Sequence, residues 1–264
     1  MKQQRLFSLI MALLLVFAMT ACQKQNSDTN ENSALSALIQ SAESGDADAQ
    51  VELADAYLYG REPANAVDYA SALQWYTAAA EQGNAWAQNQ IGLMYFKAWG
   101  VDQDYAEALR WTSLSADQGL AVAQYNMGEA YYYGYGVDQD YAEAAKWYQL
   151  AADQGQAYAQ YSLGSLYYEG WGVKQDLEKA FTLMQSAANN GVIDAQTMLG
   201  WMYYTGEGTE VNLDEAVRWT RMAADQGDAG AMNNMGYLYE NGIGVEKDAE
   251  EAQKWYDKAA QADQ

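Results

Sequence analysis

Acidic side chains are the most abundant groups in this sequence that could do chemistry. The chain of 264 residues contains 36 Asp and Glu against 14 Lys and Arg, and no histidine. Two carboxylates can together hydrolyse a glycosidic bond, and closely spaced pairs such as Asp102 with Asp104, or Asp138 with Asp140, suggest calcium binding. However, these acids recur at a fixed spacing along the chain, and their loops lack the ligand order of an EF-hand. We interpret them as helix caps and expect no metal site and no cofactor.

The residues of the common catalytic motifs are absent. Without histidine the chain has no Ser-His-Asp or Cys-His constellation, and the usual zinc ligand sets are excluded. It also contains no Ser-x-x-Lys, no G-x-S-x-G and no G-x-x-x-x-G-K-[ST] sequence. We therefore predict that the protein is not an enzyme.

The single cysteine, Cys22, follows an N-terminal segment typical of exported proteins. The apolar run over residues 6–19 is shorter than the roughly 20 residues needed to span a bilayer, which indicates a signal peptide over residues 1–21. The sequence MTAC that ends it resembles a bacterial lipoprotein box. We predict that Cys22 is lipidated and that residues 22–32 form a disordered polar tether. With Gln23 after the cysteine, the expected location is the periplasmic side of the envelope, with the outer membrane favoured.

The net charge bears on the kind of partner. It is −22 for the whole chain, and removal of the signal peptide, with Lys2 and Arg5 and no acidic residue, changes it to −24. Such acidity disfavours nucleic acid and anionic membrane surfaces and favours a basic protein partner. An acidic surface that only keeps the protein soluble is the equally open alternative. We expect a monomer, attached to the membrane only through the lipid on Cys22.

A repeat of 36 residues organises the rest of the chain. It is marked by evenly spaced glycines, and a further glycine precedes them by 38 residues: Gly83, Gly119, Gly155, Gly191 and Gly227, with Gly45 before them. A period of this length predicts stacked supersecondary units that bind other molecules along an extended surface.

Each repeat has the pattern of two helices. In one repeat the segment 157–170 has apolar residues at helical spacing and ends at Gly170, and Gly172 follows in the loop. The second helix starts at an acidic residue followed three positions later by Glu, which predicts a capping box. A glycine column within the first helix (Gly92, Gly128, Gly164, Gly200, Gly236) and an alanine column predict close helix packing, and a tyrosine column (Tyr57, Tyr95, Tyr131, Tyr167, Tyr203, Tyr239) predicts a core.

The full pattern, A-x-A-Q-x-x-L-G-x-x-Y-x-x-G-x-G-V-x-x-D-x-x-E-A-x-x-W-Y-x-x-A-A-x-Q-G, resembles the Sel1-like repeat, a relative of the tetratricopeptide repeat. The resemblance covers about residues 33–261. It implies an all-α fold over residues 33–264: an α/α solenoid, a right-handed superhelix, of six helix-pair repeats with an N-terminal capping helix. It also implies that the first helix of each pair lines the concave side, and that the protein acts as a scaffold, adaptor or regulator. Cysteine-rich relatives have been described as penicillin-binding, but this chain lacks their cysteines.

Positions that vary between repeats on the first helix are the candidate binding residues, because packing does not fix them. They form three columns rich in Tyr and Trp, the types enriched at binding hot spots. We predict that a partner protein binds these residues in the concave groove: Trp86, Asn89, Leu93, Tyr125, Glu129, Tyr158, Tyr161, Ser165, Trp201 and Tyr237.

The leading hypothesis is a membrane-anchored periplasmic scaffold or adaptor. One alternative is an immunity protein that neutralises a periplasmic toxin, since some lipoproteins with similar repeats are encoded beside type VI lipase effectors. Another is a carbohydrate- or cell-wall-binding module that uses Trp86, Tyr161 and Trp201. The alternative to all three is that these side chains bind no ligand and are either exposed to solvent or packed against the neighbouring repeat.

Overall fold

The computed structural model describes residues 36–62, 64 and 66–262, which form helices joined by short turns, with no strand in these ranges. The predicted signal peptide, Cys22 and the tether lie outside the described residues. The helical array falls into two compact units, one that ends at Gln103 and one that starts at Asp104.

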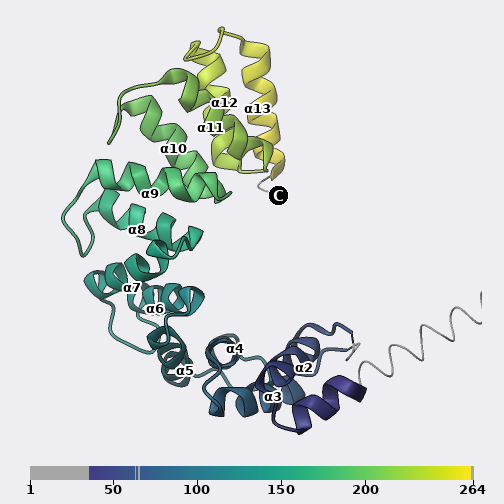
Figure 1. The fold of residues 1–264 in the computed structure, drawn as a ribbon. Coiled ribbons are helices and arrows are strands. Elements are labelled where there is room, and N and C mark those ends of the chain that lie inside the picture. Colours follow the sequence, from purple (N-terminus) through teal and green to yellow (C-terminus); the bar gives the residue numbers. More distant parts are fainter. Residues whose placement is uncertain (1–35, 63, 65, 263–264) are drawn as a thin grey trace, which may run out of the picture. The chain divides into compact units, whose positions relative to one another are not determined.

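Six helix pairs follow a helical segment at residues 36–43 in the described part of the chain (Figure 1). We call the first helix of each pair the A helix and the second the B helix. The A helices are α2 (Ala47–Tyr59), α4 (Ala85–Lys97), α6 (Ala121–Tyr133), α8 (Ala157–Glu169), α10 (Ile193–Thr205) and α12 (Ala229–Asn241). The B helices are α3 (Tyr69–Glu81), α5 (Tyr105–Asp117), α7 (Tyr141–Asp153), α9 (Leu177–Asn189), α11 (Leu213–Asp225) and α13 (Ala249–Ala262). Helices α2 to α4 belong to the first unit and α5 to α13 to the second. Within each unit every helix packs against the next one along the chain, which confirms the predicted all-α repeat solenoid.

The glycines within the A helices mark close approach to the B helix of the same pair, as predicted. A Cβ atom on Gly128 would lie 2.4 Å from the ring of Tyr148, and one on Gly236 equally close to the ring of Tyr256. These glycines cost helix propensity of about 1 kcal/mol each. In return, these glycines permit a large side chain to pack directly against the helix backbone.

The second glycine of each loop joins one repeat to the one before it. Gly172 has φ +67°, and a Cβ there would lie 2.3 Å from the carbonyl carbon of Tyr141, at the start of the preceding B helix. The loop residue between the two glycines, Trp171, stacks on the Tyr141 ring with centroids 5.4 Å apart. The loop is therefore a contact between repeats as well as the helix stop and turn expected from the sequence.

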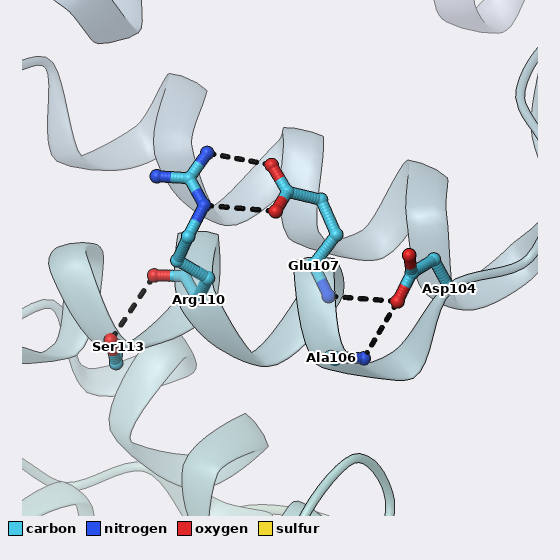
Figure 2. A network of polar contacts seen from close by, with 5 residues as sticks. All are labelled: Asp104, Ala106, Glu107, Arg110 and Ser113. Atoms are coloured by element: carbon cyan, nitrogen blue, oxygen red, sulfur yellow. Dashed lines mark hydrogen bonds and ion pairs between the residues drawn. The ribbon is translucent and has the colours of Figure 1, made fainter.

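The acidic caps of the B helices are confirmed, but the reciprocal half of the predicted capping box is wrong. Asp104 accepts hydrogen bonds from the backbone N–H groups of Ala106 and Glu107, at 2.9 and 3.0 Å. The Glu107 side chain instead forms a two-point ion pair with Arg110, and the shorter of its two contacts is 2.6 Å (Figure 2). In the equivalent α7 the reason is visible: the N–H of the cap Asp140 already donates to the carbonyl of Tyr131 in the A helix. A glutamate is then free to pair with a cation one turn later.

Buried glutamines form a polar connection between successive repeats. Gln124 in α6 is 6% exposed, and its side-chain amide donates to the carbonyl of Ala116 at 3.3 Å. The oxygen of the same amide accepts a hydrogen bond from Gln154 of the following turn, at 2.7 Å. The Gln196–Gln226 pair repeats this contact at 2.6 Å. Because buried amides must be satisfied, this arrangement fixes how one repeat meets the next.

The predicted core columns are also confirmed. The alanine column is buried, at 0–8% exposure: Ala49, Ala87, Ala123, Ala159, Ala195 and Ala231. Within the tyrosine column, five members pack, partly buried, against the hydrophobic clusters: Tyr57, Tyr131, Tyr167, Tyr203 and Tyr239.

Candidate functional site: one face of the A helices

The residues predicted to bind a partner fall on one side of the A helices. They occupy the second, fifth and ninth positions of these 13-residue helices, and this spacing of three and four residues places side chains on one helix face. The thirteenth position, four residues further, continues the same row. We call these four positions of each A helix the A face.

In the first unit, the A face of α4 agrees only in part with the prediction. Trp86 is 40% exposed and Leu93 is half-buried, but Asn89 is 1% exposed and belongs to the core. Residues 87–92 are all buried, so this part of α4 is covered around its whole circumference. Helical periodicity alone predicts one open side, and for this reason the assignment of Asn89 to the binding surface is wrong.

In the second unit, a carboxylate lies among tyrosines on the A faces of α6 and α8. Glu129 accepts a hydrogen bond from the Tyr148 hydroxyl at 2.5 Å, and Tyr125 also hydrogen-bonds to it. The Tyr125 ring lies 5.9 Å from that of Tyr148 and 6.3 Å from that of Tyr158. Burial raises the pKa of Glu129 above its ordinary value, because desolvation outweighs the hydrogen bonds from the two tyrosines.

Two further predicted residues of α8 are less accessible. Tyr161 packs against the hydrophobic cluster around Met184 and Leu199, and burial raises the pKa of its hydroxyl. The hydroxyl of Ser165 donates to the carbonyl of Tyr161 at 3.1 Å, so it is used within the helix. Tyr158, at 57% exposure, is the accessible one of the three predicted residues of this helix.

The A faces of α10 and α12 carry a second aromatic group. Trp201 and Tyr237 are 45% and 48% exposed. The ring of Tyr204 lies 5.7 Å from that of Trp201, and its hydroxyl hydrogen-bonds to Tyr237, which raises the pKa of Tyr204. Tyr204 therefore links the exposed side chains of two neighbouring A helices.

Tyr133 and Tyr204 also lie at this surface and are not among the residues predicted from the sequence. Tyr133 is 54% exposed and occupies the thirteenth position of α6, four residues after Glu129. That spacing was a signal available in the sequence. Tyr204 carried no such signal, because its position next to the core tyrosine Tyr203 does not belong to the variable columns.

A shallow depression of about 370 Å³ adjoins Tyr158. The turns before α10 and α12 line it, with Asp194 and Asp228 among its residues. Asp228 caps α12 and accepts a hydrogen bond from Thr197 at 3.2 Å. The depression extends the exposed aromatic surface toward the N-terminal ends of the A helices and adds acidic groups to it.

Charge is segregated between the two kinds of helix in the second unit. Its A helices, α6, α8, α10 and α12, contain no Lys or Arg, and their acidic residues are Glu129, Glu169, Asp194 and Glu240. The B helices carry all seven helical cations of this unit: Arg110, Lys146, Lys179, Arg218, Arg221, Lys254 and Lys258. Four of them form ion pairs with a glutamate three residues earlier, at 2.5–2.9 Å. The A face is therefore aromatic and acidic, and the helices that form it supply no Lys or Arg.

Within the described ranges, no group of three or more Cys, Asp or Glu side chains is arranged to hold a metal ion. A search of the same residues finds no helix with the length and apolar character required to cross a membrane.

Comparison with known proteins gives a family and similar structures. The family model described as Sel1 repeat matches six segments, residues 47–84, 87–120, 121–156, 157–192, 193–228 and 229–264. The crystal structure of c5321, a protective antigen of uropathogenic Escherichia coli strains, is similar at 39% identity and a TM-score of 0.81. That match covers 86% of this chain but 48% of c5321, so this chain spans about half the length of that protein. A Sel1 repeat protein from Oxalobacter formigenes is similar at 34% identity and a TM-score of 0.70, over 73% of this chain and 77% of that one. No curated protein sequence matches the chain.

Proposed function

Because this chain belongs to the Sel1 repeat family, whose fold is suited to protein–protein interaction, we propose that it is a non-catalytic interaction protein. Its binding surface is the A face of α6, α8, α10 and α12, and its ligand is a partner protein. The single observation that carries this proposal is the row of exposed aromatic side chains on that face, from Tyr133 and Tyr158 to Trp201 and Tyr237.

Exposed aromatic side chains support binding for an energetic reason. Tyr and Trp each bury 150–250 Å² or so on association and lose little rotamer freedom. About half of the surface of Tyr158 and of Tyr237 is exposed to water. That exposed surface does not stabilise the fold and remains available for a partner. Their clustering on successive A helices favours a partner that runs along several repeats.

The charge of the surface supports a partner with basic side chains. Acids of the A helices have no Lys or Arg on the same helices to pair with, and the chain as a whole has a net charge of −22. Complementary charge of this kind mainly accelerates association, and the acceleration weakens as salt screens it. Binding to the A face should therefore slow as the salt concentration rises.

Membrane anchoring through Cys22 is a separate part of the proposal. The lipoprotein-like sequence around Cys22 supports a lipid anchor on the periplasmic side of the envelope, with the outer membrane favoured. Metabolic labelling with an alkyne fatty acid, followed by membrane fractionation, tests it. Label on the wild-type chain and its loss in Cys22→Ser are expected, and a labelled Cys22→Ser chain would contradict lipidation at this residue.

Site-specific photocrosslinking in the native cells tests the binding surface. A photoreactive amino acid is placed at Tyr158, Trp201 or Tyr237 on the A face. The matched controls are Leu114, Leu150 and Met222, apolar residues of the B helices with 38–48% exposure. A partner crosslinked from the first set and not from the second is expected. Crosslinks from the B-helix positions alone would overturn the assignment of the surface.

The same experiment separates the alternative functions. Capture of a toxin, together with loss of viability when this gene is deleted, would identify an immunity protein. No captured protein, combined with binding of cell-wall glycans that salt does not weaken, would favour the carbohydrate-binding alternative and contradict the proposal of a protein partner.

A further inference from the structure

The second unit contains a carboxylate and three neighbouring tyrosines that take part in no ion pair or cation–π contact among the described residues. We define the Glu129 cluster as Glu129, Tyr125, Tyr133 and Tyr158. The Tyr148 hydroxyl holds Glu129 from the B helix, at 2.5 Å, and Tyr125 hydrogen-bonds to the same carboxylate. Tyr125 and Tyr133 lie one turn before and one turn after Glu129 on the same face of α6, so the three side chains are neighbours. Tyr133 and Tyr158, at 54% and 57% exposure, leave the cluster open to solvent.

The carboxylate has capacity for a further donor. A carboxylate offers about four acceptor positions, and the hydroxyls of Tyr125 and Tyr148 account for two of them. Burying a carboxylate without a positive partner is unfavourable, and no Lys or Arg occurs in the helices α6, α8, α10 and α12. None of the ion pairs among the described residues involves Glu129, so a counter-charge can come from another molecule.

The first unit shows a related arrangement of a carboxylate and two tyrosines, in which an arginine lies over one of the rings. Asp55 of α2 stands at the position of Glu129 and accepts a hydrogen bond from the hydroxyl of Tyr76, the counterpart of Tyr148. Tyr59 stands at the position of Tyr133, and the guanidinium of Arg61 lies over its ring, 4.7 Å from the centroid. In the second unit, cations of the chain lie over the rings of Trp111, Tyr167, Trp219, Tyr239 and Trp255. Within the part of the chain that the structure describes, none lies over a tyrosine of the Glu129 cluster.

We propose that the Glu129 cluster is the anchor site for an arginine side chain of the partner protein. This rests on the proposed function, and it adds which group of the partner is recognised and where. An arginine fits better than a lysine, because its planar guanidinium stacks on tyrosine rings and pairs with a carboxylate through two N–H groups at once. The guanidinium stacks on Tyr133 or Tyr158 and donates to the acceptor positions of Glu129 that the tyrosine hydroxyls leave open.

A peptide titration tests this site directly. The full chain is titrated by calorimetry with a hexa-arginine peptide, and with a hexa-citrulline peptide that has the same shape without the charge. Binding of the first and not the second is expected. Glu129→Gln should weaken binding by about ten- to a hundred-fold, the loss typical of a charge-assisted hydrogen bond. Tyr133→Leu should weaken it by roughly two- to five-fold through the lost cation–π contact, and Tyr133→Phe should keep most of the affinity.

A charge-matched control separates the site from diffuse attraction. Glu178→Gln removes one negative charge from an exposed position of the B helix α9, and it should change the affinity by less than about two-fold, because exposed charges are screened. Equal losses in Glu129→Gln and Glu178→Gln would overturn the proposal, as would the absence of hexa-arginine binding to the wild type. Glutamine at 129 keeps an oxygen for the Tyr148 hydroxyl, so the variant should fold, and circular dichroism checks this.

The outcome for the partner itself distinguishes this inference from the function on which it rests. If a partner still crosslinks to Tyr158 and Trp201 with undiminished yield in Glu129→Gln, the arginine site is wrong and the interaction surface stands. If no partner crosslinks to the chain that retains Glu129, the proposed function itself is wrong.

Discussion

Replacing Gly128 with alanine should destabilise the protein strongly, although the same change one repeat later should not. The new Cβ would lie 2.4 Å from two ring carbons of Tyr148, well inside the contact distance of about 3.5–4.0 Å. Tyr148 is 1% exposed, so its ring has no room to move aside. Overpacking of this kind costs about 1–3 kcal/mol. Displacing the ring also threatens the 2.5 Å hydrogen bond to Glu129, which contributes about 1.5–3 kcal/mol.

Alanine also improves helix propensity by about 1 kcal/mol, which leaves a net loss of roughly 2–5 kcal/mol for Gly128→Ala. In Gly164→Ala the nearest atoms are Leu183 Cβ and the flexible end of Met184, both at 3.2 Å. A shift of a few tenths of an ångström relieves that contact, so the change in stability should stay within about 1 kcal/mol of zero.

Urea unfolding followed by circular dichroism measures both variants, and a double variant tests the cause. Gly128→Ala combined with Tyr148→Met recreates the alanine–methionine contact of Gly164→Ala. The two changes should therefore couple favourably, so that the double variant loses less than the two single losses added together. Equal stability of Gly128→Ala and Gly164→Ala, or strict additivity in the cycle, would refute the argument from the ring contact.

Three other predictions concern contacts between repeats and the buried acid. Gly172→Ala should lower the free energy of unfolding by roughly 2–5 kcal/mol, because the new Cβ meets backbone at 2.3 Å and φ is positive. Gly155→Ala has no atom within 4 Å of the new Cβ, so it should lose only the 1–2 kcal/mol or so that a left-handed backbone costs. Equal losses in urea unfolding would contradict the close approach at Gly172. Burial raises the pKa of Glu129, so the folded state binds its proton more tightly than the unfolded state, and this residue lowers stability as pH rises above the ordinary value of 4.5. The stability of Glu129→Gln relative to wild type should therefore increase as the pH rises above 4.5 and level off above the folded-state pKa of Glu129. A flat or falling difference would show that Glu129 is not destabilising when ionised. Gln154→Ala removes the donor to Gln124 at 2.7 Å and should cost about 1–2 kcal/mol, and a cycle with Gln124→Met that proves additive would argue against this amide contact.

The local part of the fold was predictable from the sequence because it depends on neighbours within one helical turn. The cap at Asp104 needs only the N–H groups two and three residues later. Gly170 ends α8 in the left-handed conformation that glycine adopts without strain. The exposure of Tyr158, Trp201 and Tyr237 also followed from the repeat. Neighbouring helices cover the positions that stay constant between repeats, so the positions that vary are the ones left exposed.

The errors arose where a side chain had a choice of partners from another helix. In α7 the carbonyl of Tyr131 in the A helix satisfies the N–H of the cap Asp140, so Glu143 pairs with Lys146 instead of the cap. Asn89 is buried because α4 is covered on more sides than an average A helix. Neither fact can be read from helical periodicity, which describes one helix and not what surrounds it.

The sequence by itself determined the 36-residue period, the helix pairs, their caps and the glycines at close contacts. It also determined that α6, α8, α10 and α12 carry acids and no cation. Only the tertiary structure decided that Glu129 meets Tyr148, 19 residues away, and that the rings of Tyr125 and Tyr158 from successive A helices lie 6.3 Å apart. Helix formation is governed by contacts a few residues apart, whereas the charge state and accessibility of a side chain are governed by groups that distant segments bring to it.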